Sequence, residues 1–185
     1  LVTDSARPTT VKTRVIAGHQ HVVRIDQEER TQVSESSEQR MLDKLEEHLG
    51  SLEGIILQDY NKGVIGDRII EGVVRIAQTK DIPVFVDPKF HNFFSYRGVA
   101  VFKPNRKETE DALGYRLHNE ETIIGAARTI RERLGCRHVL LTLGELGMLL
   151  LQSDDTIVRV PTRARKVADV SGAGDTVIAT LAASM

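Results

Sequence analysis

The feature that most constrains the fold is a regular alternation of short apolar runs with amphipathic segments of helical period. Residues 53–60, 82–89 and 99–105 are apolar runs of strand length, and residues 64–81 and 120–135 carry apolar residues at helical spacing. This alternation is typical of a parallel β-sheet covered by helices on both faces. We therefore predict an α/β fold of three layers with a mainly parallel sheet at its centre.

Weaker patterns complete the expected order of elements. Two β-rich runs, 10–17 and 21–26, predict a hairpin that is exposed on one face. A Ser-rich start and Gly50 bound an expected helix over 34–50. The apolar stripes of the two longer helical segments are Ile65, Ile69, Val73 and Ile76, and Ile123, Ala127, Ile130 and Leu134; further elements are expected at 106–114, 137–152 and 156–161.

Composition excludes several classes of protein. The chain has 185 residues, enough for one domain with a core, and a net charge of −1, which argues against a general nucleic-acid binder. No apolar run approaches the roughly 20 residues that span a bilayer. The single cysteine, Cys136, cannot form an internal disulfide and is interpreted as structural. We expect a cytoplasmic protein with neither membrane nor nucleic-acid partners.

Polar clusters follow the apolar runs directly. These clusters are "QDY", "VDPK", "KPNRKE", "TLGELG" and "DVSGAGD". Ligands of an open α/β sheet bind beyond the carboxyl ends of its strands. We therefore expect the five clusters to converge at one edge of the sheet.

The segment 172–175, "GAGD", allows two interpretations. Its glycines allow the backbone N–H groups to point into one concavity, and a helix beginning there would add its dipole to an anion hole. Asp175 beside that hole could accept a proton from an attacking hydroxyl. The alternative is a glycine-rich turn in which Asp175 only caps a helix.

Two other clusters are equally open when taken alone. In "TLGELG", 142–147, a glycine turn could pass close to nucleotide phosphates, or it could simply connect two hairpin strands. In "KPNRKE", Asn105 and Glu108 could hold Mg²⁺ through water, or they could form an N-cap with an acidic first turn.

The remaining candidates are pairs of carboxylate and lysine at strand ends and cations on the hairpin. "VDPK" and "QDYNKG" could face a phosphate or sugar hydroxyls, or they could be solvated strand ends. Lys12, Arg14 and Arg24 could contact an anionic substrate, although exposed surface charge explains them as well. The six histidines lack metal-ligand spacing and receive no role.

The order of these motifs resembles the PfkB/ribokinase family of sugar kinases. The segments "VDPKF", "YRGVAVFKPNRKE" and "DVSGAGDTVIATLAA" are similar to the kinase half of the ADP-heptose synthase group. That group comprises the D-glycero-β-D-manno-heptose-7-phosphate kinases of lipopolysaccharide-core synthesis. The likeness extends from about residue 7 to the end of the chain.

The resemblance implies a role for each matching residue. Asp175 would be the catalytic base, and the backbone of Gly172, Ala173 and Gly174 would form the anion hole for the transferred phosphoryl group. Residues implied to bind ATP and its phosphates are Thr142, Gly144, Gly147, Asn105 and Lys89; those implied to place Mg²⁺ are Asn105, Glu108 (through water) and Asp87; those expected near the sugar are Asp59, Lys62, Lys12 and Arg14.

The resemblance also implies the organisation and activity of the domain. Residues 1–185 would be a partial ribokinase-like kinase domain, with a β lid at 10–26 that also makes a homodimer contact and an α/β core at 34–185. The family's N-terminal strands and C-terminal adenine-site region are missing, so we expect truncation at both ends. ATP and Mg²⁺ are the expected cofactors and a sugar phosphate the acceptor. The alternatives are another PfkB kinase, such as a ribokinase or fructokinase, and an inactive nucleotide-binding or oligomerising fragment.

Overall fold

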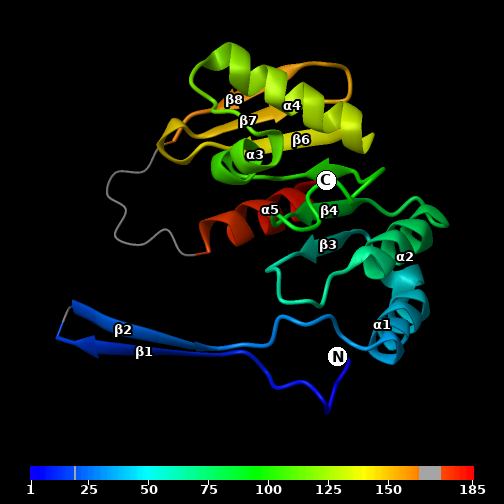
Figure 1. The fold of residues 1–185 in the computed structure, drawn as a ribbon. Helices are drawn as coiled ribbons and strands as arrows, with labels where there is room; N and C mark the ends of the chain where they lie inside the picture. Colours follow the sequence, from blue (N-terminus) through cyan, green and yellow to red (C-terminus); the bar gives the residue numbers. More distant parts are fainter. Residues whose placement is uncertain (19, 163–171) are drawn as a thin grey trace.

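A six-stranded sheet forms the centre of the computed structural model, which describes residues 1–18, 20–162 and 172–185 (Figure 1). The strand order is β3-β4-β5-β6-β7-β8, parallel from β3 to β6 and antiparallel from β6 to β8. The bounds are β3 Ile55–Gln58, β4 Val84–Asp87, β5 Val101–Phe102, β6 His138–Thr142, β7 Met148–Leu151 and β8 Ile157–Val160. The prediction of a mainly parallel sheet is confirmed.

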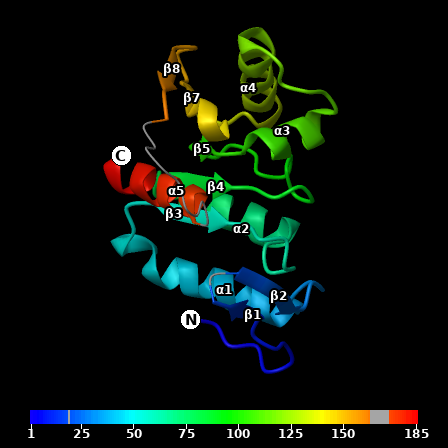
Figure 2. The same cartoon turned by 90° about the vertical axis from the view of Figure 1, so that its left-hand side faces the viewer.

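Helices lie on both faces of this sheet (Figure 2). Four of them share one large hydrophobic core with one sheet face, whereas α5 packs on β3 and β4 at the opposite face. Their bounds are α1 Glu35–His48, α2 Asp67–Gln78, α3 Arg106–Leu113, α4 Glu120–Leu134 and α5 Ala173–Ser184. The three-layer architecture is therefore confirmed.

The alternation of side chains along β4 explains why two separate cores form. Val84 and Val86 point into the core beneath α2, and Phe85 between them belongs to the smaller core beneath α5. In that smaller core Ile178 is the buried side chain that α5 contributes, at 1% exposure. The helix that carries Asp175 thus rests on the sheet through one buried anchor.

Local sequence signals account for most helix boundaries. Ser34 caps α1 by accepting a hydrogen bond from the Ser37 backbone N–H. Gly114 and Gly135 end α3 and α4 in the left-handed conformation, which costs glycine little because it has no Cβ. The apolar stripe predicted for α4 is buried.

Three predicted boundaries are shifted. The helix at 34–50 ends at His48, and Gly50 lies within a 3₁₀ turn, Leu49–Ser51, instead of ending the helix. Ile65 precedes α2 but still packs against the core. The run 99–105 is a strand only over Val101–Phe102, although backbone hydrogen bonds of Ala100 and Lys103 to β4 continue the ladder.

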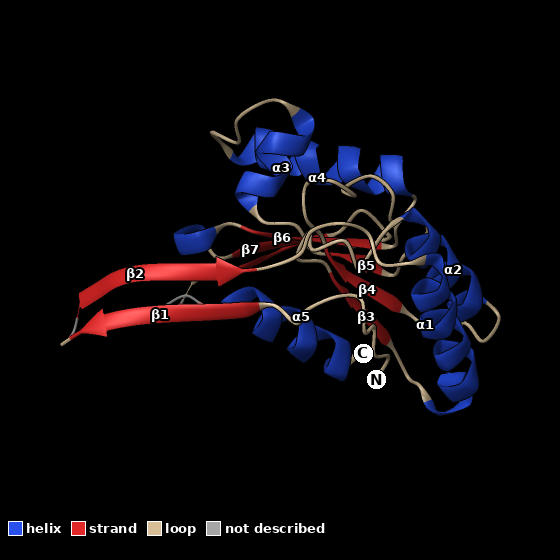
Figure 3. Cartoon of the chain, turned by 60° about the horizontal axis from the view of Figure 1, so that its bottom comes forward, coloured by secondary structure: helices blue, strands red, loops and turns tan. Residues whose placement is uncertain are grey.

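The predicted hairpin consists of β1, Val11–Ala17, and β2, Gln20–Gln27, and it projects away from the sheet (Figure 3). The prediction that only one face is exposed is wrong, because every described residue of both strands is exposed. Val15 pairs with Val23 and Thr13 with Ile25 on one side of the ribbon, opposite a side that carries Arg14 and its partner Arg24. The hairpin therefore has a largely apolar face and a face that carries charged residues together with Ile16.

Across the described ranges, no helix combines the length and the apolar character that crossing a membrane requires.

Candidate active site

The N-terminus of α5 lies at the carboxyl edge of the sheet. Gly172 precedes the helix with a φ of 78°, and its carbonyl accepts the Thr176 N–H at 2.9 Å. The N–H groups of the first turn have no partner within the helix, so they and the helix dipole favour an anion there. Asp175 is exposed in this first turn. The "DVS" of the motif, 169–171, lies outside the described residues.

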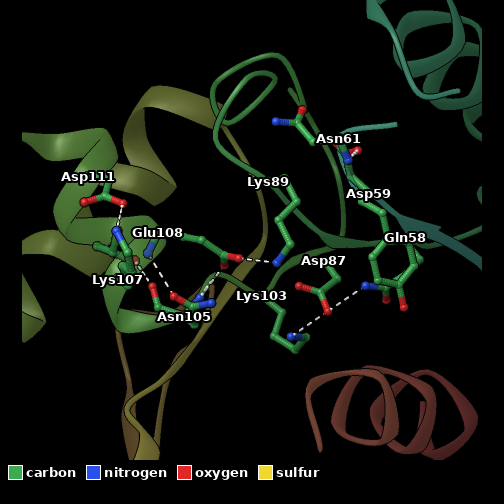
Figure 4. A network of polar contacts seen from close by, with 12 residues as sticks. Gln58, Asp59, Asn61, Asp87, Lys89, Lys103, Asn105, Lys107, Glu108 and Asp111 are labelled. Atoms are coloured by element: carbon green, nitrogen blue, oxygen red, sulfur yellow. Dashed lines mark hydrogen bonds and ion pairs between the residues drawn. The ribbon is translucent and has the colours of Figure 1, made fainter. Parts of the chain in front are cut away.

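Three side chains from neighbouring strand ends, Gln58, Asp87 and Lys103, lie close to α5 (Figure 4). Lys103 Nζ is 2.9 Å from Asp87 Oδ2, and Gln58 Nε2 donates to the same oxygen at 2.9 Å. The ion pair is almost completely buried. A Cβ at Gly174 would be 3.4 Å from Lys103 Nζ and 3.6 Å from Asp87 Oδ2, so the first turn of α5 sits directly on the pair.

A second polar group lies at the start of α3. The Asn105 side chain accepts the Glu108 N–H at 2.8 Å, and Glu108 Oε2 accepts the Asn105 N–H at 2.9 Å. This is a capping box, as one of the two interpretations of "KPNRKE" requires. Glu108 also pairs with Lys89. Burial is the largest single effect on Lys89 and disfavours its charged form, but the hydrogen bond to Glu108 and the nearby negative charges of Glu108, Asp87 and Asp59 together outweigh it and raise the pKa of the lysine.

A cleft of about 860 Å³ opens beside α5 and brings together Asn105, Thr142, Gly144 and Gly147 of the residues expected to bind phosphates, whereas Lys89 does not line it. A parallel bridge joins Asn105 to Thr142, and Gly144 follows in the β6–β7 turn with a φ of 62° and open space beside it. Gly147 also requires glycine, because a Cβ there would meet the Val160 carbonyl at 2.0 Å. The "TLGELG" segment is thus both a hairpin connection and a wall of the cleft, which it shares with Ala173 and Gly174.

The far wall of this cleft is basic. Arg106 and Arg116 both contact Glu110, whose carboxylate also accepts the Leu117 N–H at 2.9 Å. That backbone hydrogen bond and the bond from Arg116 lower the pKa of Glu110 to about 2. A buried carboxylate therefore holds two guanidinium groups at the cleft.

A second cleft, of about 420 Å³, is lined by the loop that follows β3. Tyr60 lines it and donates its hydroxyl to Asp175 Oδ2 at 3.1 Å. Burial and then this hydrogen bond raise the pKa of Tyr60. The other polar residues of its wall are Arg30, Gln32, Asn61, Lys62, His91 and Asn92.

The base of the hairpin forms one side of this smaller cleft. Arg7 donates to the carbonyls of Glu29 at 2.7 Å and of Lys62, and Lys62 pairs with Glu28. The Val33 N–H bonds the Gly63 carbonyl at 2.9 Å. The hairpin and the segment that carries Tyr60 are therefore fastened together.

The four residues expected near the sugar occupy different environments. Lys62 lines the smaller cleft. Asp59 is 2% exposed, and its carboxylate accepts hydrogen bonds from Asn61 N–H at 2.7 Å and Tyr96 hydroxyl at 2.9 Å. Asp59 thus orders the loop beneath the cleft. Lys12 and Arg14 are exposed on the projecting hairpin and line neither cleft.

The residues expected to place Mg²⁺ already have protein partners. Glu108 uses both oxygens, Asn105 uses its side-chain oxygen, and Asp87 uses Oδ2. Within the described ranges, no group of three or more His, Cys, Asp or Glu side chains could hold a metal ion. This donor set fits an ion that keeps its water shell and is carried by phosphates, not an ion caged by protein ligands.

The structure adds residues that the sequence patterns did not single out. Lys103, Gln58 and Tyr60 belong to quoted motifs but had received no role. For Lys103 a signal existed, because a lysine directly after a buried strand must find a partner. For Tyr60 there was none, because its contact to Asp175 spans 115 residues of sequence.

Known sequences match this chain over nearly its whole length. A family model described as "pfkB family carbohydrate kinase" matches residues 1–185. The bifunctional protein HldE of Pelobacter propionicus is 44% identical over 182 residues, which are 98% of this chain and 37% of that protein. HldE of Paramagnetospirillum magneticum is 40% identical over 185 residues, covering 100% of this chain and 38% of that protein. The chain thus spans less than two-fifths of the length of these relatives.

Solved structures share the fold at lower identity. A tetrameric inhibited form of phosphofructokinase-2 from Escherichia coli matches with a TM-score of 0.73 and 20% identity, over 95% of this chain and 59% of that chain. Arabidopsis thaliana ribokinase, complexed with ribose and ATP, matches with a TM-score of 0.70 and 21% identity, over 96% and 56%. These matches confirm a ribokinase-like fold and cover little more than half of each solved chain.

Proposed function

We propose, since this chain belongs to the PfkB family of carbohydrate kinases, that it forms the phosphoryl-transfer core of an ATP-dependent sugar-phosphate kinase. The observation that carries the proposal is that Asp175 connects two clefts: its neighbours Ala173 and Gly174 line one, and its hydrogen-bond partner Tyr60 lines the other. The larger cleft contains Asn105, Thr142 and the first turn of α5. The smaller cleft reaches Asp175 through Tyr60.

The two clefts suit two different ligands. The larger one combines glycine turns, a helix N-terminus and the guanidinium groups of Arg106 and Arg116, which favour a polyphosphate such as that of ATP. The smaller one, with Arg30, Lys62 and Asn92, suits a hydroxyl-rich acceptor that carries a negative charge. In this proposal the acceptor hydroxyl lies next to Asp175 and the γ-phosphoryl group lies over the α5 N-terminus.

The reaction then needs few protein groups. The acceptor oxygen forms a bond to the γ-phosphorus while the bond from that phosphorus to the β–γ bridging oxygen breaks, and ADP leaves with that electron pair. Asp175 accepts the proton that the hydroxyl loses. Because the transition state of phosphoryl transfer is loose, catalysis comes mostly from positioning and charge stabilisation, and a carboxylate is a sufficient base.

In this proposal Mg²⁺ binds together with the nucleotide. Glu108 and Asp87 would hold its coordinated waters, since the carboxylates already have protein partners, and the ion would supply charge neutralisation to the phosphates.

For the acceptor we propose D-glycero-β-D-manno-heptose 7-phosphate, phosphorylated at O1 to the 1,7-bisphosphate. Two facts support this choice: the likeness of the motifs to the heptose kinase group, and the 40–44% identity to HldE proteins over nearly the whole chain. The product would serve ADP-heptose and lipopolysaccharide inner-core synthesis.

We further propose that two copies associate through the hairpin. The apolar side of the ribbon exposes Val11, Val15, Val23 and Ile25 by 44–57%. A two-stranded ribbon with an uncovered apolar face is marginally stable alone, so a partner ribbon would stabilise it.

The test is turnover by the natural full-length protein that contains this chain. ADP release would be measured with heptose 7-phosphate, ribose and fructose 6-phosphate, each at saturating ATP and Mg²⁺. We expect turnover with the heptose phosphate and loss of most of it in Asp175→Asn with ATP affinity retained. Asp43→Asn, at an exposed carboxylate of α1, is the matched control and should retain full activity.

Each contrary result removes a different part of the proposal. Near-normal turnover in Asp175→Asn would exclude this residue as the base. Turnover with ribose alone would exclude the heptose acceptor. No turnover with any of the three acceptors, although ATP binds, would favour a nucleotide-binding role without catalysis.

A further inference from the structure

One charged side chain beneath α5 has no role in the reaction as described so far. Lys103 follows β5 at the carboxyl edge of the sheet and is 2% exposed. An ammonium group is almost never buried to this extent unless it is paired, because desolvation of the charge is costly. Its partner is Asp87, at the end of β4, 2.9 Å away.

A gain in fold stability does not explain why Lys103 and Asp87 form a buried ion pair. Replacing a buried ion pair with well-packed apolar residues is often neutral or stabilising, so such a pair is weak support for a purely structural role. Here both charges lie at the strand ends, where the ligands of an α/β sheet bind. Among the described residues, Asp87 is the one ion-pair partner of Lys103 Nζ, which has three N–H donors.

At Gly174, Lys103 lies next to the turn that forms the anion hole. A Cβ at this glycine would lie 3.4 Å from Lys103 Nζ, so a methyl group there would be in van der Waals contact with the ammonium group. Since Gly174 is the second residue of α5, the lysine lies against the turn whose free N–H groups favour an anion.

We propose that Lys103 is a charge-stabilising residue of phosphoryl transfer: its ammonium group, held by Asp87, donates a hydrogen bond to the phosphoryl group bound at the N-terminus of α5. This inference rests on the proposed function and adds a side-chain cation to a hole otherwise made of backbone N–H groups. During transfer, negative charge is spread over the equatorial phosphoryl oxygens, and a fixed buried cation stabilises that charge without reorganisation of water. Asp87 keeps the lysine ordered before the nucleotide binds.

The experiment compares two variants of the full-length protein that both contain Asp87→Asn. Asp87→Asn retains the ammonium group, and Lys103→Gln with Asp87→Asn removes it while leaving a neutral pair that can still hydrogen-bond. Neither variant leaves a buried carboxylate without a cation, but Asp87→Asn leaves the ammonium group without its carboxylate, so kcat is compared only at temperatures where both variants are folded. Arg131→Gln with Asp155→Asn neutralises a more exposed ion pair between α4 and the β7–β8 turn that lines neither cleft, and it is the control for loss of an ion pair. Thermal unfolding of every variant reports on the fold.

Two measurements distinguish a charge-stabilising role from a structural one. Relative to Asp87→Asn, the double variant should lose about 100-fold or more in kcat while the KM for ATP changes less than about threefold, as for removal of a preorganised donor. Its affinity for ADP with aluminium fluoride, a mimic of the transferred phosphoryl group, should fall by a similar factor, whereas its affinity for ADP alone should not. Calorimetry gives both affinities.

The outcomes separate this inference from the proposed function. Equal kcat and equal affinity for the fluoride complex in the two variants would overturn the role of Lys103, as would a natural protein that fails to bind the complex. If the natural protein binds the complex but phosphorylates no sugar, the proposed function fails, and the fluoride affinities of the variants still decide the role of Lys103.

Discussion

The attachment of α5 to the sheet gives the sharpest prediction, because this helix carries Asp175 through one buried anchor. Ile178 packs into a small cluster with Phe85, Ala100, Val101 and Leu140. We predict that Ile178→Ala loosens α5 and lowers kcat more than it lowers the stability of the rest of the domain.

The magnitude follows from the burial. Ile178 is 1% exposed, and truncation of a buried isoleucine to alanine costs about 2–5 kcal/mol. It is the fully buried side chain of the 12-residue helix, so this loss falls on the contact that holds α5 in place. A cost of 2 kcal/mol changes the equilibrium between docked and undocked helix by about 30-fold.

The matched control is Ile130→Ala in α4. Ile130 is 0% exposed, so the same atoms leave an equally buried site, but this site belongs to the large core on the other sheet face. Hydrogen exchange by mass spectrometry would report the opening of each helix, and steady-state kinetics would report kcat. We expect faster exchange in α5 together with a loss of kcat for Ile178→Ala, and a loss of global stability with kcat retained for Ile130→Ala.

A clear result would refute this reasoning. If Ile178→Ala leaves exchange in α5 and kcat unchanged, or if both variants lower kcat equally, Ile178 is not the anchor that positions Asp175.

Three further predictions concern other parts of the chain. Gly174→Ala should lower kcat, because its Cβ would lie 3.4 Å from Lys103 Nζ. The control is Gly125→Ala in α4, where a Cβ would have nothing within 4 Å; it should raise stability by about 0.5–1 kcal/mol at unchanged kcat. Equal effects of the two substitutions on kcat would contradict this prediction. Glu110→Gln should cost about 1–3 kcal/mol in urea unfolding at neutral pH. Because the pKa of Glu110 is lowered from 4.5 to about 2, the ionised group stabilises the fold above pH 4.5, so the difference from the natural protein should shrink as the pH falls from 4.5 to 2; a constant difference would contradict this. Val15→Glu with Val23→Glu, on the apolar face of the hairpin, should abolish dimers in sedimentation experiments, whereas Arg14→Glu with Arg24→Glu on the charged face should not; dissociation by both pairs would argue against an apolar contact.

Periodicity and capping carried most of the fold prediction. The α4 stripe, the Ser34 cap and the end of β4 at Asp87-Pro88 are local signals, and the structure agrees with them. The errors occur where the local sequence pattern does not determine what surrounds a segment in the fold. Gly50 does not end α1, and the hairpin is exposed on both faces because the described chain packs nothing against it.

Part of the candidate site could be predicted from the order of the motifs along the chain. Strand ends of a parallel sheet meet at one edge, so the convergence of "VDPK", "KPNRKE" and "TLGELG" followed from their order in the chain. The partners of each side chain did not follow, because Glu108 could equally have faced solvent, a metal ion or Lys89.

By itself the sequence determined which residue types stand at the strand ends, because apolar runs and polar clusters are properties of neighbouring residues. It thereby determined that glycines and a carboxylate begin the last helix. Only the tertiary structure decided that Tyr60 bonds Asp175, that Lys103 is buried against Asp87 next to Gly174, and that Tyr60 and the first turn of α5 line two different clefts. These contacts join segments up to 115 residues apart, and their geometry depends on how the strands and helices pack together.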